Sequence, residues 1–107
     1  MAVARIQIPK EAKSGEVVSV RLAIQHPMET GFRHDVMGRA IPKNVINTLT
    51  CRYDGHEVFR AEMGSGIAAN PYLQFYLRAT TSGELVFEWV DDAGERGSER
   101  ATLTVTG

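Results

Sequence analysis

The side chains in this sequence that could bind a transition metal through nitrogen or sulfur are three histidines, four methionines and one cysteine. His26, Met28, His34 and Met37 fall within one segment, and imidazole and thioether groups are ligands that copper accepts. However, no two histidines lie two positions apart on a strand or four apart on a helix, which would place both on one face. We therefore expect no metal site, and a copper-binding domain built on these four residues is kept as an alternative.

The residues that could do catalysis form no recognisable set. A hydrolytic triad needs a nucleophile, a histidine and an acid that orients it, and no serine has the nucleophile-elbow context. Cys51 falls on the apolar side of an alternating run, which predicts a small buried hydrophobic residue rather than a reactive thiol. Asp91 and Asp92 come shortly before a glycine, which predicts that they form a turn. We therefore expect neither an enzyme nor a bound cofactor.

The overall composition limits the classes of protein. The 107 residues fit a single domain, 1–107. With 12 Lys and Arg against 13 Asp and Glu, the net charge of -1 argues against nucleic-acid binding, which depends on clustered basic residues. No apolar run approaches the roughly 20 residues that a membrane helix needs, so no membrane partner is expected. The single cysteine excludes an internal disulfide and a cysteine zinc cluster.

Alternation of apolar and polar residues predicts seven strands. They are expected at 4–8, 16–25, 45–53, 56–63, 72–79, 84–90 and 98–106. Asp54-Gly55 separates two of these runs and predicts a two-residue type I′ hairpin, because both central residues of that turn have positive φ. Pro9 to Ser14 is expected to hold one short turn. Short strands at regular spacing predict an all-β, immunoglobulin-like antiparallel β-sandwich of about seven strands without a disulfide.

Two segments, 26–44 and 63–73, interrupt the rhythm of strands and tight turns. Loops longer than roughly 12–15 residues are uncommon in compact domains and are often functional. The first segment predicts a long projecting loop or hairpin with Asp35 to Gly38 near its tip. The second carries Ile67, Ala68 and Ala69 where an exposed loop is expected, which indicates either a plug at the end of the sandwich or a contact surface.

These same segments resemble the signature segments of the SoxZ family, the smaller subunits of the thiosulfate-oxidation carrier complex SoxYZ. The residues that carry the resemblance are HPMETGFRHD…G…IPKNVIN, from His26 to Asn47, and IAANPYLQF, from Ile67 to Phe75. It extends over nearly the whole chain, through RIQIPKEAKSGEVV near the start, EVFRAEM and LVFEWVDDAG.

The resemblance implies an immunoglobulin-like subunit that pairs with SoxY and has no catalytic group of its own. SoxY carries the sulfur intermediates on a cysteine in a flexible C-terminal arm, and other Sox enzymes load, oxidise and hydrolyse that sulfur. This chain ends in ATLTVTG without such an arm, so the sulfur attachment is not transferred to Cys51. A generic β-sandwich recognition module, with no preference for SoxY, is the alternative.

The resemblance also changes the expected location. The start of the chain, MAVARIQIPK, lacks the basic and apolar regions of a signal peptide, which by itself predicts a cytoplasmic protein. SoxZ-like subunits are instead expected in the periplasm, which they reach by co-export with a folded, signal-bearing SoxY.

We expect the partner contacts in the two irregular segments, at or beside a surface that meets SoxY or the other Sox enzymes. The residues are His26, Pro27, Met28, Glu29, Thr30, Gly31, Asn70, Pro71 and Tyr72. Methionine is adaptable and tyrosine amphipathic, so both suit interfaces. Replacing Met28 and Tyr72 with alanine is expected to weaken association and leave the fold intact. In isolation, an exposed strand edge predicts a homodimer at high concentration.

Overall fold

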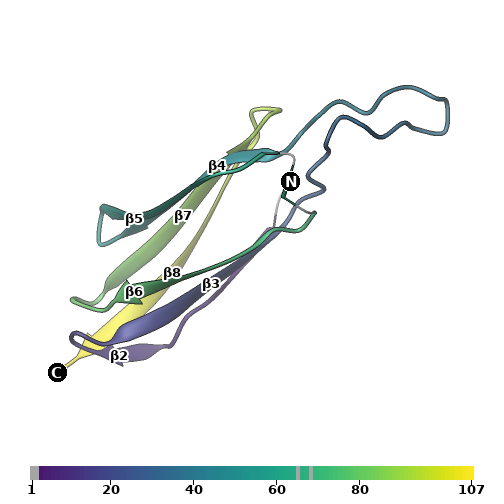
Figure 1. Cartoon of the computed structure of the whole chain (residues 1–107). Coiled ribbons are helices and arrows are strands. Elements are labelled where there is room, and N and C mark those ends of the chain that lie inside the picture. Colours follow the sequence, from purple (N-terminus) through teal and green to yellow (C-terminus); the bar gives the residue numbers. More distant parts are fainter. Residues whose placement is uncertain (1–2, 65, 68) are drawn as a thin grey trace.

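The computed structural model of the chain describes residues 3–64, 66–67 and 69–107. Two β-sheets face each other and form a sandwich, from one end of which a hairpin projects (Figure 1). One sheet has the strand order β1-β3-β6 and the other β2-β8-β7-β4-β5. The strands are β1 Val3–Gln7, β2 Glu11–Lys13, β3 Val17–Gln25, β4 Ile46–Tyr53, β5 His56–Glu62, β6 Tyr72–Arg78, β7 Gly83–Asp91 and β8 Arg96–Thr106.

The all-β sandwich is confirmed, and each of the seven predicted strands is present. The prediction of a short turn between Pro9 and Ser14 is wrong for Glu11–Lys13. These residues form β2, an eighth strand that pairs in parallel with β8. Three residues are too few for an alternation signal, and only Ala12 of the three is buried. The N-terminal segment therefore leaves the three-stranded sheet after β1 and joins the five-stranded sheet at β2.

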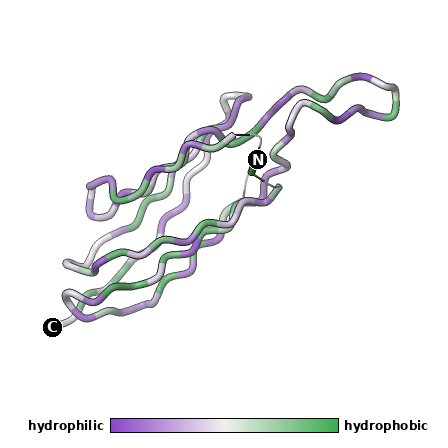
Figure 2. The backbone as a smooth tube through the Cα atoms, viewed as in Figure 1, coloured by the Kyte–Doolittle hydropathy of each residue, from purple (hydrophilic) through white to green (hydrophobic). Residues whose placement is uncertain are grey.

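The core lies between the sheets and follows the predicted alternation. Along β3, Val18, Val20, Leu22 and Ile24 are at most 3% exposed, and apolar and polar segments alternate along the strands in Figure 2. Such alternation buries one face of each sheet, and a fully buried side chain of this size stabilises the fold by about 1.5–3 kcal/mol.

Aromatic rings connect the two sheets within this core. Phe59 of β5 stacks on Phe75 of β6 with ring centroids 4.4 Å apart, and Phe75 also lies 6.2 Å from Phe87 of β7. Cys51 is fully buried beside this layer, as predicted, and burial raises the pKa of its thiol to about 12 despite the nearby Arg52. The predicted type I′ turn is confirmed by positive φ at both Asp54 and Gly55.

Candidate functional site

The predicted hairpin between β3 and β4 is confirmed (Figure 1). At its base, the amide of Glu29 donates to the carbonyl of Asn44 and the amide of Asn44 donates back, both at 2.8 Å. Further out, His34 and Ala40 form a second antiparallel bridge. The tip closes where the Gly38 amide donates to the carbonyl of Asp35 at 3.0 Å. The hairpin thus keeps backbone pairing beyond the edge of the sandwich.

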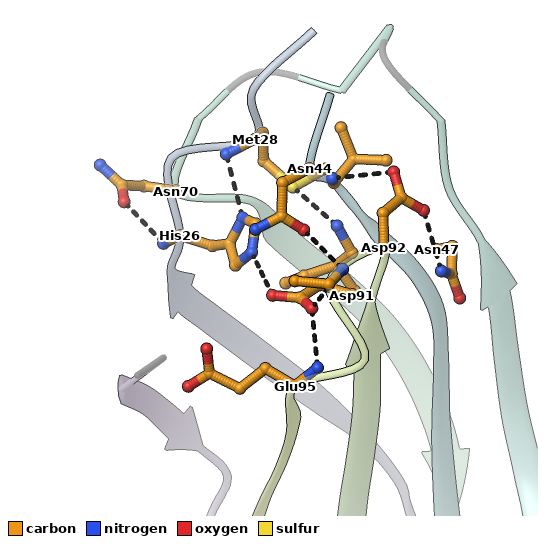
Figure 3. Close-up of polar contacts among 11 residues, drawn as sticks. His26, Met28, Asn44, Asn47, Asn70, Asp91, Asp92 and Glu95 are labelled. Carbon is orange, nitrogen blue, oxygen red and sulfur yellow. Dashed lines mark hydrogen bonds and ion pairs between the residues drawn. The ribbon is translucent and has the colours of Figure 1, made fainter. Parts of the chain in front are cut away.

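The imidazole of His26 lies buried at the base of this hairpin, 6% exposed (Figure 3). Its Nδ1 accepts a hydrogen bond from the Met28 amide at 3.0 Å, and its Nε2 lies 3.1 Å from Oδ2 of Asp91. Because Nδ1 faces an N–H donor, the proton of the neutral ring is on Nε2, which donates to the Asp91 carboxylate. Both ring nitrogens are therefore engaged inside the chain.

Asp91 ends β7 and is 5% exposed. Its Oδ1 accepts hydrogen bonds from the amides of Ala93 at 3.0 Å and Glu95 at 2.9 Å, which forms the turn into β8. Burial raises the pKa of this carboxyl, but the hydrogen bonds from His26, Glu95 and Ala93 outweigh burial, and the pKa lies below its ordinary value. The predicted turn role is confirmed, and the contact with His26 adds a second role.

The neighbouring carboxylate, Asp92, holds the chain as it enters β4. It accepts hydrogen bonds from the side-chain amide of Asn47 at 3.1 Å and from the backbone amide of Val45 at 3.2 Å. These bonds lower the pKa of Asp92, and the Lys43 ammonium, 3.9 Å away, adds to the effect. Asp91 and Asp92 therefore fix the two ends of the hairpin segment, the first through His26 and the second through Val45.

The second predicted segment joins the first through Asn70. The His26 amide donates to Oδ1 of Asn70 at 3.0 Å, and the Asn70 amide donates to the His26 carbonyl at 2.8 Å. Asn70 has a φ of 54°, a left-handed conformation that asparagine tolerates better than most residues. The carbonyl of the buried Pro71 accepts the Ile24 amide at 3.0 Å. The two segments thus form one structural unit.

Met28 closes the end of the core. Its side chain is 3% exposed, and its sulfur accepts a hydrogen bond from the Ile46 amide at 3.3 Å. The residue has a φ of 51°, which is costly for a side chain of this size and persists only where the surroundings impose it. We refer to His26, Met28, Asn70, Asp91 and Asp92 together as the anchor.

The nine residues predicted to contact a partner differ in exposure. Pro27, Asn70 and Tyr72 are exposed, Glu29, Thr30 and Gly31 are partly buried, and His26, Met28 and Pro71 are buried. Partner contact stays a prediction for all of them. Since the Met28 side chain packs inside its own chain, we no longer expect its replacement by alanine to leave the fold intact.

The large apolar side chains exposed on the hairpin were not among the predicted contacts. Phe32 is 84% exposed, Val36 100% and Met37 73%. The charges around them pair within the hairpin, Arg33 with Glu29 at 2.6 Å and Arg39 with Asp35 at 3.3 Å. The sequence could have indicated these contacts, because Val36 and Met37 are apolar residues at a tip that is expected to be exposed. The structure shows that they do face solvent.

The alternative copper site is not assembled. His26 and Met28 are buried with their ligand atoms in hydrogen bonds, whereas His34 and Met37 are exposed further along the hairpin. Across residues 3–64, 66–67 and 69–107, no group of three or more His, Cys, Asp or Glu side chains could hold a metal ion. Within the same ranges, no helix is long and apolar enough to span a membrane.

The apolar patch predicted in the second loop is only partly described. Ile67 is 39% exposed and Ala69 is exposed, while Ala68 lies outside the described residues. The choice between a plug and a contact surface at these three residues therefore stays open.

The family model for sulphur oxidation protein SoxZ matches residues 6–102. The chain belongs to the SoxZ family. It is accordingly a Sox sulfur-oxidation protein, and the resemblance of the signature segments is confirmed. No curated protein matches this SoxZ chain by sequence.

Solved structures share the fold of this SoxZ chain. A superoxide reductase (neelaredoxin) from Ignicoccus hospitalis has 19% identity and a TM-score of 0.75, covering 96% of this chain and 79% of that one. The sulfur carrier protein SoxY from Chlorobium limicola f thiosulfatophilum has 14% identity and a TM-score of 0.67, covering 97% and 79%. A putative superoxide reductase from Thermotoga maritima has 17% identity and a TM-score of 0.73, covering 97% and 86%. At these identities the likeness concerns the fold alone.

Proposed function

We propose that this chain is the non-catalytic subunit of a SoxYZ carrier complex in thiosulfate oxidation. It pairs with SoxY and helps present the sulfur intermediates on the SoxY cysteine to other Sox enzymes. Membership of the SoxZ family supports this role. Its own thiol is unsuited to carry sulfur, because Cys51 is fully buried and a pKa of about 12 leaves almost no thiolate at neutral pH.

The observation that carries the proposal is the anchored hairpin with three exposed apolar side chains. Burying Phe32, Val36 and Met37 against a partner would stabilise a complex by about 1.5–3 kcal/mol for each fully buried side chain. The surrounding charges are already paired within the hairpin, so little uncompensated charge is desolvated. A contact of this apolar kind is typical of a permanent subunit interface.

The anchor lowers the entropy cost of this contact, because it orders the base of the hairpin before binding. A hairpin that is ordered only on binding would lose conformational entropy at that moment, which subtracts from affinity. Here the hydrogen bonds of His26 with Met28, Asn70 and Asp91 hold the base before any partner arrives. The signature residues therefore support binding by fixing the direction of the hairpin.

The test is co-expression with SoxY from the same organism, followed by size-exclusion chromatography and titration calorimetry. The wild-type chain should form a one-to-one complex. Replacing Phe32, Val36 and Met37 together with serine should weaken it about 100-fold or more, since each 1.4 kcal/mol is tenfold in affinity. Val58→Ser, at a 39% exposed position of β5, is the matched control and should bind as the wild type does. Absence of a wild-type complex, or full affinity of the triple variant, would contradict the proposal.

Two further features of the proposal concern the chain outside its complex. We place it in the periplasm, exported together with a signal-bearing SoxY. The isolated chain leaves the hairpin and one edge each of β5 and β6 uncovered, which predicts a homodimer at high concentration. A monomer throughout a sedimentation-equilibrium series would contradict the second expectation.

A further inference from the structure

The outer face of the β1-β3-β6 sheet has an unusual composition. Its charged side chains are Arg5, Arg21 and Arg78, and its aromatic side chains are Tyr72 and Tyr76, all five exposed. None of the outward positions of the three strands carries Asp or Glu. We call this surface the arginine–tyrosine face.

The strand register places these side chains side by side. Ala23 of β3 pairs with Arg5 of β1 on one side and with Tyr72 of β6 on the other, so a small residue lies between a guanidinium and a phenol. The next outward row holds Arg21 opposite Gln74. Since neighbouring strands lie about 4.8 Å apart, these residues form one continuous patch.

The outer face of the other sheet carries charges of both signs, and several of them are paired. Arg52 lies 2.5 Å from Glu88 and Arg100 lies 3.7 Å from Glu84. On the arginine–tyrosine face, Arg78 donates to the backbone carbonyl of Gly15, and the face holds no carboxylate with which an arginine could pair. In a chain with a net charge of -1, one sheet face is therefore purely cationic.

Tyrosine and arginine are enriched at protein interfaces, whereas Lys, Asp and Glu are depleted there. Tyr72 is 58% exposed and Tyr76 69%, so both offer large amphipathic surfaces to a partner. The hairpin, by contrast, has neutralised its charges and exposes apolar groups. Two surfaces of such different chemistry fit two different partners.

We propose that the arginine–tyrosine face is a docking surface for an acidic protein surface, carried by an enzyme that visits the complex. This inference rests on the proposed function, in which SoxY is held at the hairpin. A cationic patch attracts an acidic partner over a distance and speeds encounter, and it releases the partner readily as salt rises. Such behaviour suits a partner that must bind, act on the carrier and leave.

The experiment uses the heterodimer with SoxY and a charge-reversal double variant, Arg5→Glu with Arg21→Glu. The control, Arg96→Glu with Arg100→Glu on β8, changes the net charge equally on the other sheet. Each purified Sox enzyme from the same organism is the probe, by interferometry at about 50 mM and about 300 mM salt. At least one should bind, lose affinity with salt, and bind the Arg5/Arg21 variant at least about tenfold more weakly, with the control near wild type.

The double variant Tyr72→Ala with Tyr76→Ala should bind the same enzyme more weakly. The salt dependence of binding should not change, because the variant removes contact area and no charge. Equal binding by all heterodimers, or no enzyme bound to the wild-type heterodimer, would overturn the inference. So would loss of the heterodimer itself in the Arg5/Arg21 variant, which would assign the face to SoxY, or binding of duplex DNA or anionic vesicles in place of an enzyme. Failure of the proposed function is distinct, because then no wild-type heterodimer forms.

Discussion

The anchor lies at the base of the hairpin but is opposite in character to the outer part of the hairpin. His26 and Met28 are buried with their polar and sulfur atoms engaged, whereas Phe32, Val36 and Met37 a few residues later face solvent. The signature segments of the family contain His26, Met28 and Asn70 of the anchor and also Phe32 of the hairpin, whereas Val36 and Met37 lie between the matched stretches. The difference teaches that one signature segment can combine buried residues that fix a hairpin in place with exposed residues that we propose contact a partner.

The two methionines of this segment give the sharpest test of the contrast. Met28→Ala should lower the free energy of unfolding by about 3 kcal/mol, because it leaves a cavity at the end of the core and an unpaired Ile46 amide. Met37→Ala, at a 73% exposed position, should change it by less than about 0.5 kcal/mol. Urea unfolding of both variants measures the difference. Similar losses would mean that the anchor and hairpin are not separate in their energetics.

Two aspartates allow the same comparison for hydrogen bonding. Asp91 and Asp35 each accept two backbone amides through Oδ1, Asp91 in the anchor and Asp35 at the hairpin tip. Asp91→Ala should cost about 2–3 kcal/mol, because it also leaves the buried His26 Nε2–H without a partner. Asp35→Ala, in a partly exposed turn, should cost less than about 1 kcal/mol. Thermal unfolding monitored by circular dichroism measures both, and a larger loss for Asp35→Ala would refute the ranking.

Acid should weaken the anchor. The folded-state pKa of Asp91 lies below its ordinary value of 3.8, so the unfolded state binds this proton first as pH falls. The stability that the carboxylate contributes is therefore complete above about pH 5 and is lost as pH falls through the folded-state pKa. In Asp91→Asn this acid-side loss should shrink. The measurement is the free energy of unfolding from neutral pH down to about pH 3, and identical slopes in both proteins would count against the role of Asp91.

The smallest expected effect on stability comes from a cysteine introduced at the tip of the hairpin, where the reactivity of its thiol can be measured. Val36 is fully exposed, so Val36→Cys should leave the free energy of unfolding within about 0.5 kcal/mol of wild type. Its thiol should react rapidly with a disulfide reagent at mildly alkaline pH, whereas Cys51 should react only after unfolding. Thiol titration with and without denaturant measures the contrast. Two fast thiols in the native variant would show that the core at Cys51 opens readily.

Most of the fold could be predicted from the sequence because its signals are local. Alternation along β3 and the Asp54-Gly55 turn depend only on neighbouring residues, and both predictions are confirmed. The parallel pairing of β2 could not be predicted, because three residues carry no periodicity and the partner strand lies at the other end of the sequence.

The sequence predicted which two segments form the site, but it did not predict which of their residues are buried and which face solvent. The segments at 26–44 and 63–73 were expected to act together, and the reciprocal bonds between His26 and Asn70 join them. The pairing of His26 with Asp91 spans 65 positions, and Asp91 already had a sufficient local explanation as a turn residue. Burial, which decides that Met28 faces inward and Met37 outward, is a property of the assembled sandwich.

The parallel pairing of β2 with β8 has a mechanical consequence. The three residues of β2, Glu11–Lys13, pair in order with Thr104, Val105 and Thr106, and the two strands run in the same direction along the 60 Å axis. β1 lies toward the hairpin end and β8 finishes at the opposite end (Figure 1). A force that pulls the two ends of the chain apart along this axis therefore slides β2 along β8 and loads their hydrogen bonds together, instead of opening them one at a time. A strand of three residues thus serves as a shear clamp at the edge of the five-stranded sheet.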